Sequence, residues 1–143
     1  MATSEPWVTL GRSYEASLVL IREPDKEVSV ASLGERLAGF LIVDMHGPFT
    51  GYIQTVCVAP EFRGQGIGSS LVAWAEARIF RDRPNVFMCV SSFNAGAFRL
   101  YQRLGYEVVG ELRDYLVRGH SEILLRKTRG PWTEFVRRGD TAQ

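Results

Sequence analysis

A strand, a glycine-rich loop and the beginning of a helix follow one another in Val56-Cys57-Val58-Ala59-Pro60-Glu61-Phe62-Arg63-Gly64-Gln65-Gly66-Ile67-Gly68-Ser69-Ser70-Leu71. The first backbone amides of a helix have no partners within the helix, and the helix dipole adds positive potential at that end. Glycines allow a phosphate group to approach the main chain closely. This stretch therefore predicts a seat for a pyrophosphate group.

Two common nucleotide-binding loops do not fit these residues. A P-loop has Lys and then Ser or Thr directly after its last glycine, whereas here Ile67 follows Gly66 and Ser69 follows Gly68. A dinucleotide-binding fingerprint counted from Gly64 and Gly66 requires glycine where Ser69 stands. Both types of loop are therefore excluded.

The sequence on either side of the loop predicts a mixed order of strands and helices. Apolar and alternating segments predict strands at 27–32, 37–44, 52–58, 86–90, 106–112 and 121–127. Helical periodicity or capping predicts one or two short helices within 4–21, a helix from Gly66 and another after Asn94. This order predicts an α/β (α+β) fold with a mixed, mostly antiparallel sheet flanked by helices in a single domain.

The helix that begins at Gly66 shows an amphipathic pattern. The residues expected to form its apolar face are Ile67, Leu71, Trp74 and Ile79. Glu76 and Arg78 are expected to point away from the core. In the second helix, Asn94 is a candidate N-cap and Gly105 suits a left-handed residue after its end.

Composition narrows the classes of protein that this chain can represent. The chain has 143 residues and a net charge of +1 from 17 basic and 16 acidic side chains, which gives no electrostatic case for nucleic acid or an anionic membrane. No apolar run is long enough to cross a bilayer, and the N-terminus lacks the pattern of a signal peptide, so a cytoplasmic location is expected. Cys57 and Cys89 are expected to be buried reduced thiols, and because His46 and His120 stand alone, no metal site is expected.

Several motifs resemble those of the GNAT superfamily of acetyl-CoA-dependent N-acetyltransferases. Arg63-Gly64-Gln65-Gly66-Ile67-Gly68 matches the family's (Arg/Gln)-x-x-Gly-x-(Gly/Ala) signature, and the strand over 56–60 is similar to its V-x-V-x-P strand. The segment 94–106 resembles its later N-x-x-A-x-x-L-Y-x-x-x-G-F/Y motif. The resemblance covers about 28–127, and the C-terminal half resembles bacterial ribosomal-protein N-terminal alanine acetyltransferases. It implies an N-acetyltransferase domain over 1–128, and the charged segment 129–143 is expected to be a surface tail.

The resemblance implies how acetyl-CoA would bind. The main chain that would hold the pyrophosphate comprises Arg63, Gly64, Gln65, Gly66, Ile67, Gly68 and Ser69. Val56 and Val58 would pair through their backbone with the pantetheine arm, which enters where this strand splays from the strand at 86–91. Asn94 would bind the arm through its side chain, although a plain helix cap is an alternative role. The amide of Val58 or a neighbour is a candidate donor to the oxyanion.

Tyr101 is the candidate catalytic residue. In the family, the tyrosine at this motif position points at the thioester sulfur as the general acid, and a phenol is protonated at neutral pH. The alternative interpretation is an aromatic side chain packed in the core, and this is the expected role of Tyr106. A non-catalytic module that binds coenzyme A or has a regulatory function is the alternative to an enzyme.

The general base is left open by the sequence. Some relatives carry Glu on the strand at 52–58, where this chain has Tyr52, Gln54 and Thr55, and the alanine acetyltransferases carry Glu where this chain has Cys89. A neutral thiol is a poor base, although a thiolate is an alternative. The remaining candidates are Asp44, His46, Glu111, Asp114, His120, or water acting through Tyr52 or Gln54.

The acceptor is expected to be a primary amine, either a small molecule or the α-amine of a peptide or protein. Tyr115, in the segment between the last two strands, resembles the tyrosine that lines the peptide slot in N-terminal acetyltransferases. Tyr52 and Gln54 are the other candidate substrate-binding residues. The opposite wall would come from the segment that contains Trp7, Leu10 and Tyr14, with ordinary packing as the alternative role.

One departure from the family pattern concerns the first strand. Family members usually have a strand before the segment that resembles 4–20, and no such strand is found in this sequence. Three alternatives are open: a neighbouring chain supplies the strand, the strand is absent, or a shortened reading frame has removed it. Because its absence exposes a sheet edge at about 27–32, formation of a homodimer is a hypothesis.

Overall fold

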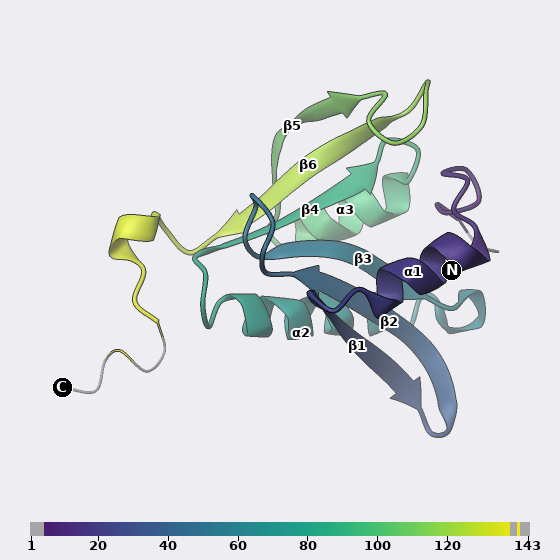
Figure 1. The fold of residues 1–143 in the computed structure, drawn as a ribbon, viewed down its shortest axis with the longest axis horizontal. Coiled ribbons are helices and arrows are strands. Elements are labelled where there is room, and N and C mark those ends of the chain that lie inside the picture. Colours follow the sequence, from purple (N-terminus) through teal and green to yellow (C-terminus); the bar gives the residue numbers. More distant parts are fainter. Residues whose placement is uncertain (1–4, 138–139, 141–143) are drawn as a thin grey trace.

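A six-stranded sheet lies at the centre of the computed structural model, which describes residues 5–137 and 140 (Figure 1). The strands are β1 (Lys26–Leu33), β2 (Arg36–Asp44), β3 (Tyr52–Val58), β4 (Asn85–Ser91), β5 (Glu107–Arg113) and β6 (Ser121–Thr128). The helices are α1 (Tyr14–Arg22), α2 (Ile67–Ile79) and α3 (Ala95–Arg103), with short 3₁₀ helices η1 (Pro60–Phe62) and η2 (Trp132–Glu134). Parts of the predicted domain and tail, at 1–4, 138–139 and 141–143, lie outside the described residues.

The sheet is mixed and mostly antiparallel, which confirms the predicted fold class. Its strand order is β1-β2-β3-β4-β6-β5, and only β3 and β4 run parallel. Helix α1 lies over one face of the sheet, and α2 and α3 lie over the other (Figure 1). Each strand expected from the sequence is present, with ends that differ by at most one residue.

The neighbouring strands β3 and β4 stay together only at their beginnings. Their paired residues are Tyr52 with Phe87 and Ile53 with Met88, and the Phe87 amide also donates to the carbonyl of Gly51 at 3.0 Å. Gly51 has φ +93°, and a Cβ there would lie 2.6 Å from Ile79 and 2.7 Å from a backbone oxygen. Glycine at position 51 therefore permits the close approach that joins the two halves of the sheet.

Beyond this junction a β-bulge separates β3 from β4. In the register between β2 and β3, Ile42 lies opposite Thr55 and Val43 lies opposite Ile53, so Gln54 is an extra residue in β3. A bulge bends its strand and interrupts regular pairing. The splay expected between these strands is therefore present, and it begins at the bulge.

The main core lies between the sheet and α2. Alternate residues of β4, Val86, Met88 and Val90, point into it together with Leu71 and Ile79 of α2. Because side chains alternate along a strand, Cys89 and Ser91 point to the opposite face, the one that carries α1. The two faces of the sheet thus have different side chains at the splay.

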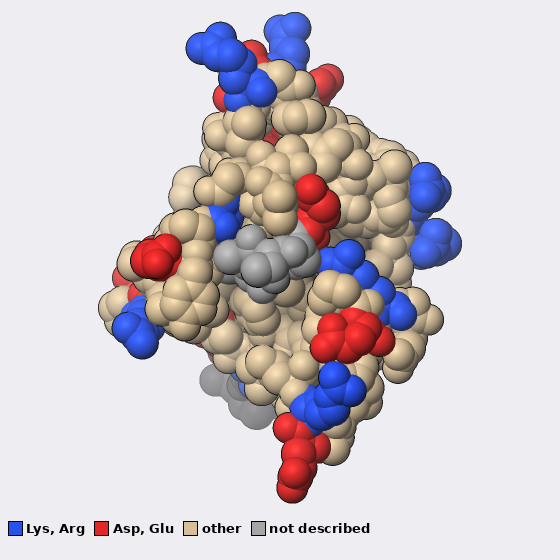
Figure 2. All heavy atoms as spheres, turned by 90° about the vertical axis from the view of Figure 1, so that its right-hand side faces the viewer, with Lys and Arg blue, Asp and Glu red and all other residues tan. Residues whose placement is uncertain are grey.

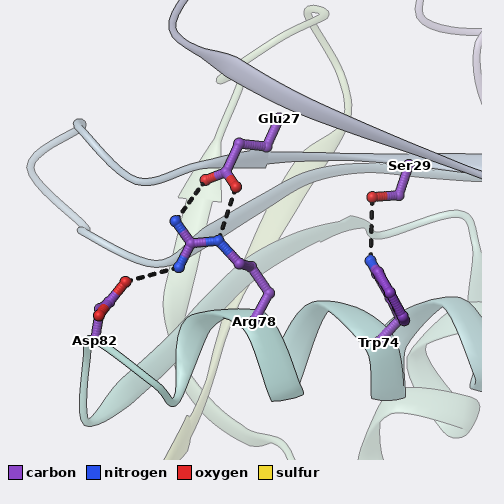
Figure 3. A network of polar contacts seen from close by, with 5 residues as sticks. All are labelled: Glu27, Ser29, Trp74, Arg78 and Asp82. Atoms are coloured by element: carbon purple, nitrogen blue, oxygen red, sulfur yellow. Dashed lines mark hydrogen bonds and ion pairs between the residues drawn. The ribbon is translucent and has the colours of Figure 1, made fainter. Parts of the chain in front are cut away.

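The prediction that Trp74 lies on the apolar face of α2 is wrong. This side chain is 64% exposed, and its indole nitrogen donates to the hydroxyl of Ser29 on β1 at 3.1 Å (Figure 3). Its neighbour Arg78 binds both carboxylate oxygens of Glu27, at 2.7 and 3.0 Å, and also Asp82 at 2.8 Å. The flank of α2 that faces β1 therefore makes polar contacts instead of continuing the core.

The outer edge of β1 has no partner strand within the described residues, and no strand precedes α1 in that part of the chain. The homodimer expected from this edge stays a prediction. Within the same residues, no helix combines the length and the apolar character needed to cross a membrane.

The contact between Arg78 and Glu27 yields a prediction for stability. Arg78→Gln is expected to lower the free energy of unfolding by about 0.5–1 kcal/mol, because the bidentate pair is partly exposed and therefore partly screened by solvent. Urea denaturation measures the change, and molar salt should reduce it. Arg81→Gln is the matched control, since Arg81 is exposed on the same helix end and forms no ion pair with a described residue. Equal losses in both variants would contradict the assigned contact.

Candidate functional site

The loop before α2 has the geometry expected of an anion-binding turn. Gly64 and Gly66 have φ +75° and +80°, in the left-handed region that favours glycine. Gly66 is the N-cap of α2, so no side chain caps the helix, and its first turn contains no acidic residue. The first hydrogen bond back into the loop comes from the amide of Ser70 to the carbonyl of Gly66. The preceding amides are left for an external acceptor.

A cleft of about 780 Å³ opens beside this loop. It is lined by ten of the eleven residues expected to bind the cofactor, namely Val56, Val58, Arg63, Gly64, Gly66, Ile67, Gly68, Ser69, Asn94 and Tyr101. Gln65 is exposed in the same loop and does not line the cleft. Trp7, expected on the acceptor side, is buried and also lines this cleft.

The splay leaves one edge of β3 available to a ligand. From Thr55 to Val58 this strand pairs with β2 only, and its other edge has no strand partner among the described residues. An extended chain that carries amide groups can add to such an edge by backbone hydrogen bonds. Val56 and Val58 lie on this segment, as the sequence predicted.

Two polar side chains at the cleft have defined roles in the protein itself. Asn94 is the N-cap of α3, since its side-chain oxygen accepts from the amide of Ala97 at 3.2 Å, while its amide nitrogen forms no hydrogen bond to a described residue. The guanidinium of Arg63 donates to the carbonyls of Val58 and Glu5, each at 3.3 Å. Arg63 thus ties the loop to the end of β3.

Tyr101 projects from α3 into the buried end of the cleft. Its side chain is 9% exposed and lies edge-to-face with Tyr106, with the ring centroids 6.2 Å apart. Burial raises the pKa of Tyr101 to about 12, so the phenol keeps its proton at neutral pH. Its hydroxyl forms no hydrogen bond to any described residue, although it lines the cleft. It is therefore able to donate to a group that enters there.

The candidate acceptor residues lie away from this cleft. Burial is the main cause that raises the pKa of Tyr52, with further contributions from the nearby Cys89, Tyr115 and Glu122. Tyr115 is exposed in the turn between β5 and β6. Gln54 occupies the bulge, where its Oε1 is buried without a hydrogen-bond partner in the described structure. None of the three predicted substrate residues lines the cleft.

Cys89 does not provide the thiolate that the sequence left open. Burial raises the pKa of this thiol, and the nearby hydroxyl of Tyr52 acts in the opposite direction without reversing the shift. The ordinary thiol pKa is already above neutrality, so Cys89 is protonated at neutral pH. Both cysteines are free thiols; Cys57 is buried, and Cys89 is half-buried.

The carboxylates expected as general bases already have structural roles. Asp44 lies 2.6 Å from the ammonium of Lys26 and accepts from the amides of His46 and Gly47. Asp114 has φ +51° and accepts from the Gly119 amide at the turn between β5 and β6. Glu111 is exposed and accepts from the hydroxyl of Ser121 at 2.6 Å.

The two histidines occupy different environments. His46 is exposed in the turn after β2. His120 is half-buried and lies edge-on to Phe93, with ring centroids 4.9 Å apart, and Phe93 lines the cleft. Of these two candidates, His120 is therefore the one close to the site.

Sequence reasoning did not single out Glu122, a buried carboxylate beside the splay. Its side chain is 5% exposed, and its register partner on β4 is Ser91. Burial raises the pKa of Glu122, while a hydrogen bond from the Ser91 hydroxyl acts in the opposite direction. The sequence signal that could have indicated its burial is the position of Glu122 directly before the apolar run Ile123-Leu124-Leu125 of a predicted strand.

Neither the surface charge nor the arrangement of candidate metal ligands narrows the class of ligand further. Basic and acidic side chains are interspersed over the face shown in Figure 2, consistent with the small net charge. Across the ranges that the structure describes, no three His, Cys, Asp or Glu side chains converge in a group that would hold a metal ion.

Comparison with known families identifies the fold and its loop. The sequence profile described as "Acetyltransferase (GNAT) family" matches residues 2–106. The chain belongs to the GNAT family of acetyltransferases. The family match covers the segment of this chain that contains the left-handed glycines, the open N-terminus of α2 and the splay of β3 from β4.

Relatives of this GNAT chain include a mycothiol acetyltransferase of Mycobacterium sp. (strain JLS), 33% identical over 51% of this chain and 26% of the relative. This chain thus spans about a quarter of that relative's length. A blasticidin-S acetyltransferase of Streptomyces morookaense is 29% identical over a region that covers 73% of this chain and 77% of that protein. Among solved structures, a spermidine N-acetyltransferase from Vibrio cholerae in complex with CoA and spermine has a TM-score of 0.66 at 18% identity. The superposed region covers 82% of this chain and 76% of the chain in that structure.

These comparisons support the family but not the finer resemblance of the C-terminal half. The similarity to ribosomal-protein alanine acetyltransferases is not confirmed, and the named relatives act on different compounds. The acceptor of this GNAT chain therefore has to be argued from its own site.

The left-handed conformation of Gly66 yields a prediction for coenzyme binding. Gly66→Ala is expected to weaken binding of acetyl-CoA about tenfold, because a side chain at φ +80° costs about 1–2 kcal/mol and turns the first amides of α2 away from the anion. Isothermal titration calorimetry measures the affinity. The substituted Cβ would touch no other group within 4 Å, so the fold should be retained. Unchanged affinity in the folded variant would contradict the role of this loop.

Proposed function

We propose that this chain transfers an acetyl group from acetyl-CoA to a primary amine, on either a small molecule or a peptide or protein α-amine. The observation that carries the proposal is the composition of one cleft. It joins an uncapped helix N-terminus, the unpaired edge of β3 and the free hydroxyl of Tyr101. A pyrophosphate, an amide-bearing arm and a thioester require these three features in this order along one ligand.

The groups of acetyl-CoA have corresponding sites in the cleft. The amides between Arg63 and Ser69 would bind the pyrophosphate, since they lie at the positive end of α2 and no acidic side chain occupies its first turn. The pantetheine arm would pair with the open edge of β3 at Val56 and Val58. The free side-chain amide nitrogen of Asn94 would donate to a carbonyl of the arm while its oxygen caps α3.

Direct transfer needs a nucleophilic amine and a stabilised leaving group. The neutral amine attacks the thioester carbonyl and forms a tetrahedral intermediate with an oxyanion. A backbone amide on the open edge of β3, at Val58 or a neighbour, would donate to this oxyanion. Collapse of the intermediate breaks the carbon–sulfur bond and forms the amide, and the departing thiolate requires a proton.

Tyr101 would supply that proton. Its pKa of about 12 keeps the phenol protonated throughout the physiological range, and its hydroxyl is not committed to another described residue. Because its pKa is raised, Tyr101 stays protonated and donates a hydrogen bond to the departing sulfur, and its proton moves to the thiolate only as the phenol oxygen receives a proton from the amine. The nearby Tyr106 cannot take this role, because its hydroxyl donates to Glu76 at 3.0 Å.

The acceptor amine would approach from the face that carries α1. Tyr52 and Tyr115 are close enough to influence each other there, and Gln54 lies at the bulge where the splay begins. The solved relative that holds CoA and spermine supports an amine as the class of acceptor. We retain Tyr52, Gln54 and Tyr115 as proposed substrate-binding residues.

Tyr101→Phe tests catalysis against simple binding of coenzyme A. The variant is expected to bind acetyl-CoA with unchanged affinity and to lose about 100-fold in kcat, because the thiolate no longer receives a proton. Coenzyme A release is measured with spermine, benzylamine and short peptides as acceptors. Tyr106→Phe is the matched control, expected to lose some stability but to keep kcat.

Each result has a distinct meaning. Equal turnover in wild type and Tyr101→Phe would remove Tyr101 from the reaction. Binding of acetyl-CoA by wild type without release for any acceptor would favour a non-catalytic module that binds coenzyme A. No binding by the folded wild type would contradict the proposed function itself.

A further inference from the structure

Buried polar side chains are concentrated on the sheet face that the cofactor cleft does not use. Within the described ranges, the buried polar or charged residues are Ser17, Thr55, Ser91 and Glu122. Ser91 points away from the core because Val90 points into it, and Glu122 is the register partner of Ser91. Among these residues, Glu122 is the one with an ionisable group.

Glu122 has no cationic partner in the described structure. It forms no ion pair there, and the polar side chain opposite it in the strand register is the neutral Ser91. Burying a carboxylate without a counter-charge is unfavourable, and such groups cluster at functional sites. An acceptor amine would bring the missing proton donors and the missing positive charge.

Glu122 also lies beside the splay. Cys89 precedes Ser91 by two residues on the same face of β4, and Tyr52 lies on β3 where the two strands are still paired. Glu122 is near enough to both Tyr52 and Cys89 to raise their pKa values. These side chains line the acceptor face from the junction of β3 and β4 to the end of β4.

We propose that Glu122 is the general base that accepts a proton from the acceptor amine. This inference rests on the proposed acetyl transfer. The ammonium gives one proton to the Glu122 carboxylate, and the resulting lone pair attacks the thioester carbonyl. The carbon–sulfur bond then breaks, and the thiolate takes the proton of Tyr101. The second proton of the amine passes to the Tyr101 phenolate and so restores the phenol. Glu122 releases its proton to solvent.

The groups around Glu122 are suited to this task. Tyr52 on β3 and Cys89 on β4 are both neutral at neutral pH, because burial raises the pKa of each. On β5 the register partner of Glu122 is the apolar Leu112, and α1 buries Ser17 and Leu20. None of these groups neutralises the carboxylate, so its raised pKa brings it closer to that of a base working near neutral pH.

Glu111 provides a matched carboxylate on the neighbouring strand. It pairs in register with Ile123, which packs against the main core, so Glu111 points to the opposite sheet face from Glu122. It is exposed and accepts a hydrogen bond from Ser121. Glu111→Gln therefore removes a carboxylate next to Leu112, the register partner of Glu122, without removing the proposed base.

The test compares wild type, Glu122→Gln, Glu122→Asp and Glu111→Gln at saturating acetyl-CoA. With the best protonated amine among spermine, benzylamine and short peptides, Glu122→Gln is expected to lose about 100-fold in kcat, with partial recovery in Glu122→Asp. With hydroxylamine, which is largely neutral at neutral pH, the loss should shrink to a few-fold, because no proton has to be removed. A structural defect would lower both rates alike.

The pH dependence gives a second readout. Glu122 must be deprotonated to act, so wild-type kcat should fall as the pH drops through a folded-state pKa above the ordinary 4.5. This acid limb should vanish in Glu122→Gln and persist in Glu111→Gln. Carbon-13 NMR of the glutamate carboxyls should show one resonance with a raised pKa that is missing in Glu122→Gln.

Stability separates a catalytic role from a structural one. A carboxyl group whose folded pKa is raised makes the folded state less stable above that pKa than a neutral group would. Glu122→Gln should therefore be as stable as wild type at neutral pH or more stable, and should bind acetyl-CoA normally.

Two results would overturn the assignment while leaving acetyl transfer intact. One is unchanged turnover in Glu122→Gln at all pH values. The other is an acid limb that moves with His120→Asn instead, since His120 lies beside Phe93 at the cleft. Failure of wild type to acetylate any amine would instead refute the proposed function.

Discussion

The junction between β3 and β4 is the constraint on which the site depends. Gly51 brings the two strands together at one end, and the extra residue Gln54 bends β3 away from β4 immediately afterwards. An unbroken parallel pair would satisfy the edge of β3 and close the space between the two halves of the sheet. The bulge instead leaves backbone groups without strand partners, which is favourable only where a ligand or solvent can satisfy them.

The opening also connects two sheet faces with different chemistry. On the face covered by α2 and α3, the cleft contains the uncapped helix N-terminus and the phenol of Tyr101. On the face covered by α1, the interior contains hydroxyl groups and the carboxylate of Glu122. In the proposed reaction, a proton donor and a proton acceptor on opposite faces would serve a thioester and an amine that meet within the splay. Their separation also prevents the two groups from neutralising each other.

The sequence was most informative where local backbone chemistry determines the structure. Glycines before a helix have few alternative explanations, so the loop at Gly64 and Gly66 and the cap at Asn94 could be predicted. Helical periodicity placed Trp74 in the core, but its indole nitrogen instead binds Ser29 on β1, a contact between distant segments. The burial of Glu122 could not be predicted because it depends on the register of β6 against β4.

Helix α2 links the two halves of the sheet, which are paired with each other only at the beginnings of β3 and β4. One flank binds β1 through the pair of Arg78 and Glu27, as Figure 3 shows. The other flank carries Glu76, which accepts from Lys127 on β6 at 3.1 Å and from Tyr106 at 3.0 Å. Since β1 and β6 lie on opposite sides of the opening, α2 spans the two halves of the sheet.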